Sequence, residues 1–214
     1  MKLELKDISK SYKEKKVLDG ISVCLENGVY GLLGANGAGK TTLMSIITGN
    51  LKADGGEILY NGKAVNPLTD HDYLSHIGYL PQKMDYYEQF SGFDFLSYVC
   101  LLKGGNRKNT EEIKALLNAV HLNDVADRKI GSYSGGMKQR VGIAQAFLCS
   151  PELIILDEPT VGLDLNERKS FKEMIRETGK SATVILSTHI VSDVEEVADK
   201  VIYIKDGKLT NDSL

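Results

Sequence analysis

The chain has 214 residues, of which 42% are hydrophobic and 26% are charged, so it can build an apolar core and keep a polar surface. This composition predicts a globular protein and excludes disordered, collagen-like and coiled-coil classes. The formal net charge of only −3 argues against a broad electrostatic surface for nucleic acid or anionic lipid. We therefore expect no nucleic-acid partner, and any contact with a membrane would have to pass through another protein.

The cysteines and the apolar segments indicate the compartment. Cys24, Cys100 and Cys149 are widely separated and form no Cys-x-x-Cys pair, which argues against a zinc site or a disulfide framework and is typical of a reducing compartment. The longest segment without Asp, Glu, Lys or Arg is the 13 residues from Asn27 to Gly39, well short of the roughly 20 that a membrane-spanning helix needs. The sequence begins without the apolar stretch of a signal peptide. We therefore expect a soluble, cytoplasmic protein with no direct insertion into a membrane.

Short strands are predicted for about the first 60 residues, at 3–5, 21–25, 29–33 and 57–60. The turn-forming pairs Asn27-Gly28 and Asn61-Gly62 lie between or after them. We therefore expect the chain to open with an antiparallel β layer. From 43 to 48 apolar residues recur at helical spacing and Gly49 follows as a C-terminal cap, so a helix is entered directly from a strand.

The pattern becomes helical between about Ser91 and Lys129. Two apolar stripes carry this prediction, and they consist of Phe95, Leu96, Val99 and Leu102, then Ile113, Leu116, Leu117 and Val120. We expect Thr110 to cap the second helix, because Glu111 and Glu112 follow it with favourable first-turn charge. This part of the chain is predicted to be a mostly helical insert.

The last third of the sequence predicts a parallel sheet. Two unbroken apolar runs, 153–156 and 183–186, flank a helical pattern from Asn166 to Thr178. Fully apolar strands joined through a helix are typical of a parallel sheet covered on both faces. The segment 201–209, with a turn at Asp206-Gly207, predicts a terminal hairpin.

A glycine-rich loop lies between a predicted strand and a predicted helix. The segment from Gly34 to Thr41 fits the phosphate-loop pattern G-x-x-x-x-G-K-[ST]. Its glycines let backbone N–H groups surround an anion, and the helix N-terminus adds its dipole. We expect Lys40 to reach the β- and γ-phosphates of a nucleotide and the Thr41 hydroxyl to bind Mg²⁺. The predicted nucleotide contacts here are Gly34, Asn36, Gly37, Gly39, Lys40, Thr41 and Thr42. The predicted fold class is therefore α/β, a P-loop NTPase with a mixed, largely parallel core sheet, an N-terminal antiparallel β layer and a helical subdomain.

Two carboxylates follow the apolar run 153–156. In an open α/β sheet ligands bind at the carboxyl ends of the strands, so Asp157 is predicted to hold Mg²⁺ and Glu158 to face the water that attacks the γ-phosphate. Taken alone, such a strand could simply close with a solvated turn. Its presence beside the loop at 34–41 favours the catalytic interpretation.

A third motif precedes the apolar helical pattern of 141–148. Ser134, Gly135 and Gly136 place small residues at the start of this predicted helix. A helix N-terminus with small side chains can bind a second anion, although this segment could also be only a well-capped helix.

With these motifs in this order, the chain resembles the nucleotide-binding subunit of ATP-binding-cassette (ABC) transporters over nearly its whole length. Residues 34–41 resemble the Walker A loop, 153–158 the Walker B strand and 133–137 the signature motif of that family. The resemblance implies one ABC ATPase domain over 1–214. Within it we expect a RecA-like core with the antiparallel β layer at about 1–88 and 150–214, and a helical subdomain at about 89–149. The resemblance also implies ATP and Mg²⁺ as cofactors.

The same resemblance implies roles for residues outside the three motifs. Tyr12 would stack on adenine, and Gln82 would contact Mg²⁺ and the attacking water. Asp164 would lie at a subunit boundary, and His189 would contact the γ-phosphate. The implied catalytic residues are Glu158, His189 and Gln82, and the implied metal ligands are Thr41, Gln82 and Asp157. Structural alternatives remain open for four of these residues. Tyr12 could be an ordinary surface tyrosine and Gln82 the end of a turn. Asp164 could be only a helix cap and His189 a core histidine.

The chain departs from the family pattern in two places. Tyr133 and Met137 stand where Leu and Gln are commonest, and Val161-Gly162 stands where Ser-Ala is more usual. We expect activity to survive, because Ser134 and the glycine backbone make the phosphate contact. The changes are expected to act on the rate and on the coupling between subunits.

The resemblance further implies partners. In the family, the signature helix of one subunit closes over the ATP of a second, so we expect a head-to-tail dimer with a second copy or a homologous ATPase subunit. An integral-membrane permease would bind it on the inner face of the cell membrane, with the aromatic residues Tyr86, Tyr87, Phe90 and Phe93 as a docking region or, alternatively, as core. The overall likeness to single-cassette subunits of bacterial drug or peptide exporters favours export.

Two other functions remain as alternatives. One is a soluble ABC-type ATPase that acts as a switch or assembly factor without a permease, which co-purification with a multi-span protein would distinguish. The other is a nucleotide-binding module that no longer hydrolyses, against which Glu158 and His189 argue. Family members often carry an extension after the final hairpin, and we expect such a tail to be missing or cut off at Leu214.

Overall fold

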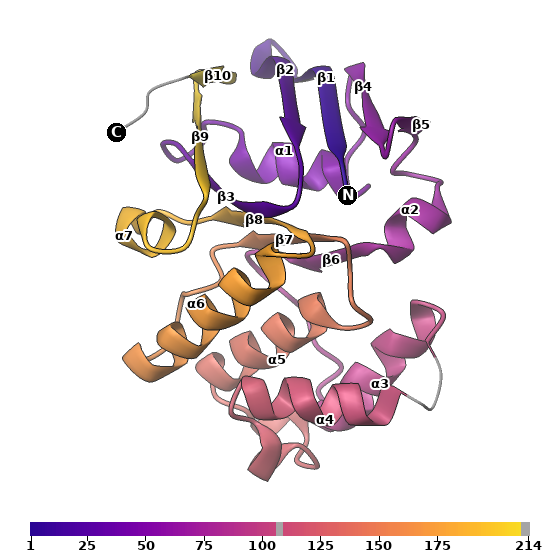
Figure 1. Ribbon diagram of the computed structural model, residues 1–214, viewed down its shortest axis with the longest axis vertical. Helices are drawn as coiled ribbons and strands as arrows, with labels where there is room; N and C mark the ends of the chain where they lie inside the picture. The colour runs from indigo at the N-terminus through magenta and orange to yellow at the C-terminus, as the bar shows by residue number, and fades with distance from the viewer. Residues whose placement is uncertain (106–108, 211–214) are drawn as a thin grey trace.

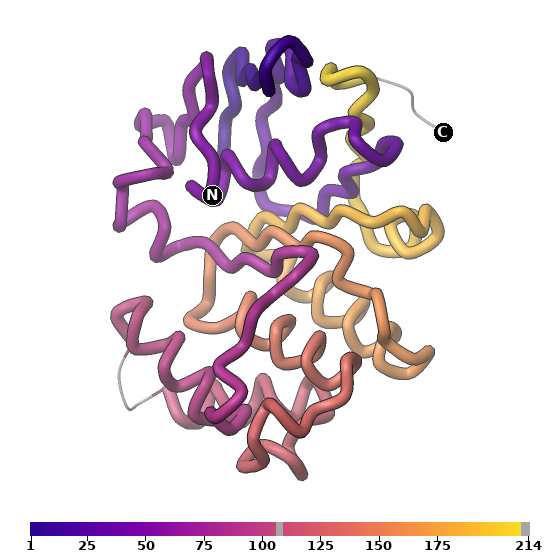
Figure 2. Tube along the Cα trace, turned by 180° about the vertical axis from the view of Figure 1, so that it is seen from behind, coloured from indigo at the N-terminus to yellow at the C-terminus, as the bar shows by residue number. Residues whose placement is uncertain are grey.

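The computed structural model describes residues 1–105 and 109–210, so the predictions for 106–108, inside the helical segment, and for 211–214 lie outside the described residues. Two sheets and a group of helices form three layers (Figure 1). The larger sheet lies in the middle, with a small sheet and helix α1 (Lys40–Ile47) on one side and most of the other helices on the opposite side. The view from behind shows the same arrangement (Figure 2).

The small sheet is antiparallel and has the strand order β2-β1-β4-β5. Its strands are β1 (Leu3–Tyr12), β2 (Lys15–Leu25), β4 (Gly55–Tyr60) and β5 (Lys63–Val65). Alternation along β1 turns Leu3 and Leu5 into the core, where both are buried. The prediction of an N-terminal antiparallel layer from the segments 3–5, 21–25 and 57–60 is therefore confirmed.

The large sheet has the strand order β10-β9-β3-β8-β7-β6 and is parallel except for the β9–β10 hairpin. Its strands are β3 (Gly28–Leu33), β6 (Ile77–Leu80), β7 (Leu153–Asp157), β8 (Thr183–Ser187), β9 (Lys200–Lys205) and β10 (Lys208–Thr210). The predicted parallel pair at 153–156 and 183–186 and the predicted terminal hairpin are confirmed. This mixed sheet makes the protein an α/β fold.

One strand assignment is wrong. We predicted that residues 29–33 belong to the antiparallel layer, but β3 pairs in parallel with both β8 and β9 in the large sheet. All six residues of β3 are buried, as expected for a strand covered on both faces. The pair Asn27-Gly28 therefore does not close a hairpin. It carries the chain from one sheet to the other, with Gly28 at φ +140°.

The longer helices follow the sequence pattern closely, and six α-helices follow α1 along the described chain. They are α2 (His71–Ser75), α3 (Gly92–Leu102), α4 (Thr110–Ala119), α5 (Gly135–Phe147), α6 (Leu165–Gly179) and α7 (Val191–Glu195). The prediction of Thr110 as a cap is wrong by one residue, because α4 begins at Thr110 and Asn109 occupies the N-cap position. Strand β6 and helices α2 and α7 have only four or five residues each, and the sequence did not predict them. No helix among the described residues is both long and apolar enough to cross a bilayer.

The large sheet separates two hydrophobic cores. Along β3, Val29 and Leu33 face the core that contains α3 to α6, whereas Tyr30 and Leu32 face the core shared with α1 and the small sheet. Strand β7 alternates in the same way. Both cores therefore depend on the same central strands.

Candidate nucleotide-binding site

The phosphate loop, residues 34–39, connects the end of β3 directly to the start of α1. The loop needs glycine at position 39, where φ is +112° and a Cβ atom would lie 2.7 Å from Cδ2 of Leu18. Gly37 also has a positive φ, of +80°. Glycines at positive φ allow the loop to curl in the way that lets backbone N–H groups surround a phosphate.

Lys40 begins α1 and is 9% exposed. Its Nζ donates hydrogen bonds to the carbonyl oxygens of Gly34 at 2.6 Å and of Ala35 at 3.2 Å. The ammonium group thus lies against the first residues of the phosphate loop, close to where phosphate oxygens would be bound. Phosphate oxygens can replace these carbonyls as its acceptors.

Asp157 is the last residue of β7 and is only 2% exposed. The Thr41 hydroxyl donates a 2.8 Å hydrogen bond to Asp157 Oδ2, although the two residues are 116 positions apart. Burial raises the pKa of the Asp157 carboxyl above its usual value, and the hydrogen bond from Thr41 opposes this effect. A hydroxyl and a carboxylate at this distance are hard oxygen donors that fit Mg²⁺.

Glu158 and His189 form a second polar pair beside the first. His189 Nδ1 lies 2.8 Å from Glu158 Oε2, and the His189 backbone N–H donates to the same oxygen at 3.4 Å. The Glu158 side chain is 12% exposed and that of His189 is 64% exposed. The alternative of a core histidine is therefore wrong, and the imidazole lies at the surface next to the carboxylate.

Most of these groups, although not His189, line one cavity of about 470 Å³. It is lined by Tyr12, Lys15, Val17, Asn36, Gly37, Gly39, Lys40, Thr41, Thr42, Gln82, Asp157 and Glu158. The structure thus brings most of the predicted site residues together from both sheets. The sequence analysis missed Lys15 and Val17 of β2. Lys15 follows Tyr12 closely in a lysine-rich segment, and only this position could have indicated that it lines the cavity. Nothing in the sequence indicated the same for Val17.

The other predicted site residues do not line this cavity, and they are Gly34, Ser134, Gly135, Gly136, Asp164 and His189. Ser134 is exposed and caps α5, where its hydroxyl accepts a 3.2 Å hydrogen bond from the N–H of Met137. Asp164 caps α6 in a reciprocal capping box with Glu167. The helix-cap alternative for Asp164 is therefore confirmed as a structural role.

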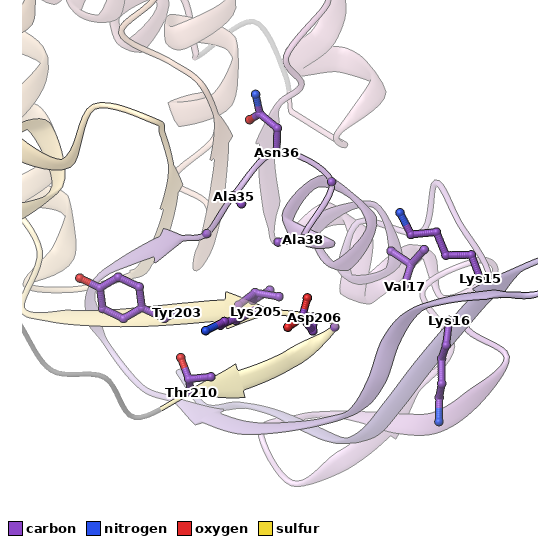
Figure 3. Close-up of a pocket in the computed structure, with 14 residues that line it drawn as sticks. Lys15, Lys16, Val17, Ala35, Asn36, Ala38, Tyr203, Lys205, Asp206 and Thr210 are labelled. Carbon is purple, nitrogen blue, oxygen red and sulfur yellow. The ribbon is translucent and has the colours of Figure 1, made fainter.

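A second cavity, of about 600 Å³, is also lined by the phosphate loop. Its lining includes Ala35, Asn36 and Ala38 of the loop, and Figure 3 shows Tyr203, Lys205 and Asp206 contributed by the β9–β10 hairpin. Gly34 lines this cavity and not the first one. The phosphate loop therefore lines both cavities.

A glycine loop between a parallel strand and a helix, a lysine along that loop, and a threonine paired with a strand-end aspartate define a P-loop nucleotide-binding protein. Comparison with known proteins identifies the family. The model described as ABC transporter matches residues 18–161, and the chain belongs to this family. It is accordingly an ATP-binding cassette with ATPase activity.

Several relatives match along almost the whole chain. An uncharacterised ABC transporter ATP-binding protein of Bacillus subtilis, YxlF, is 39% identical over 97% of this chain and 69% of its own length. The lantibiotic transport ATP-binding protein SrtF of Streptococcus pyogenes is 35% identical over 97% of this chain and 88% of its own. The linearmycin resistance ATP-binding protein LnrL of B. subtilis is 35% identical over 97% of this chain and 67% of its own length.

Solved structures confirm the fold. The ATP-binding subunit of an ABC transporter superposes with a TM-score of 0.90 at 30% identity and covers 98% of this chain and 88% of its own. A dimeric ATP-binding cassette bound to ADP and Pi gives a TM-score of 0.88 at 23% identity, over 98% of this chain and 97% of its own, and supports the fold alone. The predicted P-loop NTPase class is confirmed.

Proposed function

We propose that this chain is the ATP-hydrolysing subunit of a transporter and that it drives a separate integral-membrane permease by ATP-dependent dimer closure. One observation carries the proposal. The phosphate loop and the Asp157–Glu158 pair line the nucleotide cavity, whereas the exposed start of α5 at Ser134 does not. The start of α5 is a second helix N-terminus that could bind an anion. Because it does not line the nucleotide cavity of its own subunit, it is available to the nucleotide of another subunit.

The residues that line the cavity, and His189 beside it, have distinct tasks in this mechanism. Tyr12 stacks on adenine, and the phosphate loop with Lys40 binds the triphosphate. Thr41, Gln82 and Asp157 hold Mg²⁺, which supplies charge neutralisation at the phosphates when it is bound. Glu158 orients or deprotonates the attacking water. His189, whose Nδ1 lies 2.8 Å from Glu158 Oε2, stabilises the γ-phosphate.

The dimer is head-to-tail in this proposal, with a second copy or a homologous subunit as partner. Ser134, Gly135 and Gly136 of one subunit close over the ATP bound by the other, and Asp164 lies at the boundary. The division into a core with the β layer at about 1–88 and 150–214 and a helical subdomain at about 89–149 belongs to the same proposal. The names of SrtF, a lantibiotic transport protein, and LnrL, a linearmycin resistance protein, support export as the direction.

Tyr87, Phe90 and Tyr98 form an aromatic cluster, with Tyr87 exposed and the other two half-buried, that supports docking to the permease. The rings of Tyr87 and Phe90 stack at 5.3 Å, and Tyr98 meets both edge-on. Tyr87 is 56% exposed, whereas Tyr86 packs inward against Phe95. The subunit would thereby be held on the inner face of the cell membrane.

The dependence of ATPase activity on protein concentration tests the dimer proposal. We expect the rate per molecule of the purified chain to rise with its concentration, because each active site needs Ser134 of another subunit. Glu158→Gln should trap an ATP-bound dimer that light scattering detects, with Ser134→Arg as the matched variant that stays monomeric. A constant specific activity from a demonstrated monomer would contradict the proposal.

The docking surface is tested separately. Tyr87→Asp should leave the ATPase rate of the purified subunit within about two-fold of wild type, because Tyr87 does not line the nucleotide cavity. The same variant should lose membrane association when it is expressed with its permease, measured by fractionation. Retained association of Tyr87→Asp would place the docking surface elsewhere.

A further inference from the structure

Helix α5 makes contacts within its own subunit that the dimer proposal does not use. Its first turns pack against the segment 158–167, which runs from Glu158 to the start of α6. A Cβ atom on Gly136 would lie 2.8 Å from the carbonyl oxygen of Gly162. One turn further along, Arg140 Nε pairs with Glu167 Oε1 at 3.0 Å, with both side chains largely buried. The segment is therefore fixed to α5 at its middle and at its end.

Gln139 fixes the beginning of the same segment. Its side-chain amide donates to the carbonyl oxygen of Pro159 at 3.0 Å and, more weakly, to that of Glu158 at 3.4 Å. Gln139 is partly buried, so these bonds are shielded from competition by water. Both acceptors belong to the backbone that carries the Glu158 carboxylate.

The backbone at Glu158 needs such support. Its φ is +52°, in the left-handed region that non-glycine residues rarely adopt and that costs about 1 kcal/mol or more. The Glu158 N–H donates a 2.8 Å hydrogen bond to the carbonyl oxygen of Ser187, which holds the side of the peptide toward β8. Gln139 holds the opposite side. The hydrogen bond to Ser187 of β8 and the hydrogen bonds from Gln139 of α5 thus hold the backbone of Glu158 in its conformation.

We infer that Gln139 is a positioning residue for the ATPase reaction, which sets the direction of the Glu158 carboxylate through the carbonyls of Glu158 and Pro159. This inference rests on the proposed role of Glu158 in orienting water. It also has a consequence for the dimer, because Gln139 lies one turn after Ser134–Gly136. The helix that closes over the ATP of one site therefore holds the catalytic carboxylate of the other.

A single substitution separates this role from general packing. Gln139→Met keeps the length of the side chain and removes both donors. We expect it to lower kcat about ten-fold and to leave KM for ATP within about two-fold, since a misdirected catalytic group affects the chemical step and not nucleotide binding. Gln145→Met is the matched control on the same helix, because the Gln145 side chain makes no hydrogen bond among the described residues, and it should keep wild-type kinetics.

Two further variants keep the result decisive. Gln139→Glu retains the shape of the side chain, but its carboxylate faces two carbonyl oxygens, so kcat should fall at least as far as in Gln139→Met. In the Glu158→Gln background no catalytic carboxylate remains to be positioned, so adding Gln139→Met should lower the single-turnover rate by less than about two-fold. An undiminished ten-fold loss in that background would overturn the inference.

The outcomes also distinguish this inference from the proposed function. Wild-type protein without ATPase activity at any concentration would refute the proposed function itself. An active wild type in which Gln139→Met matches Gln145→Met would refute only the role of Gln139. A loss of activity in Gln139→Met caused by unfolding would appear as a lowered melting temperature, and Gln139→Glu then carries the test.

Discussion

Single residues in the nucleotide site differ in how visible they are in the sequence. The phosphate loop could be predicted because its glycines, Lys40 and Thr41 are contiguous and the spacing itself is the signal. Val17 reaches the same cavity only because β2 crosses beside the loop in the folded protein. The bond between Thr41 and Asp157 joins two predicted residues, but its 2.8 Å length depends on the pairing of distant elements.

Tyr12 offers a direct test at this scale. It is 49% exposed and lines the nucleotide cavity, and Lys10 Nζ lies 5.8 Å from the centroid of its ring, so a base would stack on the opposite face. Base–aromatic stacking contributes about 1–3 kcal/mol, so Tyr12→Ala should raise KM for ATP about ten-fold or more with little change in kcat. Tyr12→Phe keeps the ring and should match wild type in the same steady-state assay. Equal KM values for Tyr12→Ala and wild type would show that adenine binds elsewhere.

The cysteines provide a pH-dependent test. The sulfur atoms of Cys100 and Cys149 lie 3.2 Å apart, a contact that their separation in sequence did not predict. Burial, with the hydrogen bond to Cys100, raises the pKa of Cys149 to about 12. A raised pKa leaves little reactive thiolate at neutral pH, and the thiolate fraction grows as the pH rises toward 12. Exposed Cys24 should therefore be alkylated by iodoacetamide first at pH 7.5, measured by peptide mass spectrometry, and Cys149 should gain reactivity between pH 8 and 10. Equal labelling of Cys24 and Cys149 at pH 7.5 would contradict this.

At the scale of whole elements, periodicity predicted the long helices and the buried strands, but it could not assign each strand to a sheet. The five described residues after Gly28 in β3 are apolar or glycine, a pattern that both sheets could accept, and only the pairing with β8 and β9 decides between them. Strand β6 has four residues, too few for a period to be recognised. It pairs in parallel with β7, and α5 packs across it.

That packing depends on Gly78 of β6. A Cβ atom there would lie 1.7 Å from the carbonyl oxygen of Ala146 in α5, so the helix would have to move away from the sheet. Gly78→Ala should lower the free energy of unfolding by about 2–3 kcal/mol, as expected for overpacking, in urea titrations followed by circular dichroism. Gly55→Ala is the matched control in β4, where the nearest atom would be 4.0 Å away, and should change stability by less than about 1 kcal/mol. Comparable losses from both variants would argue against close contact of α5 with β6.

At the scale of the whole molecule, the two cores share the central strands, so we expect the described parts to unfold together. Phe95 of α3 is buried in the core that also contains Val29 and Ile154. Phe95→Ala should cost about 3–5 kcal/mol. The chain contains no tryptophan, so Tyr98→Trp on α3 and Tyr60→Trp on β4 can each report unfolding by fluorescence. Both reporters should show the same shift in urea midpoint, and a shift at Tyr98→Trp alone would mean that the helices unfold independently.

The alternation of β7 has a last consequence for catalysis. Leu153 and Ile155 point to the same side of the sheet as α1, and Ile154 and Leu156 point to the other. Asp157 is next in this odd-numbered series, and parity alone turns its carboxylate toward Thr41 at the start of α1. Deleting one of the four apolar residues before Asp157 would turn this carboxylate to the opposite face of the sheet, although Asp157 and Glu158 would both remain, so the direction of the side chain depends on the length of the strand as well as on the residue type.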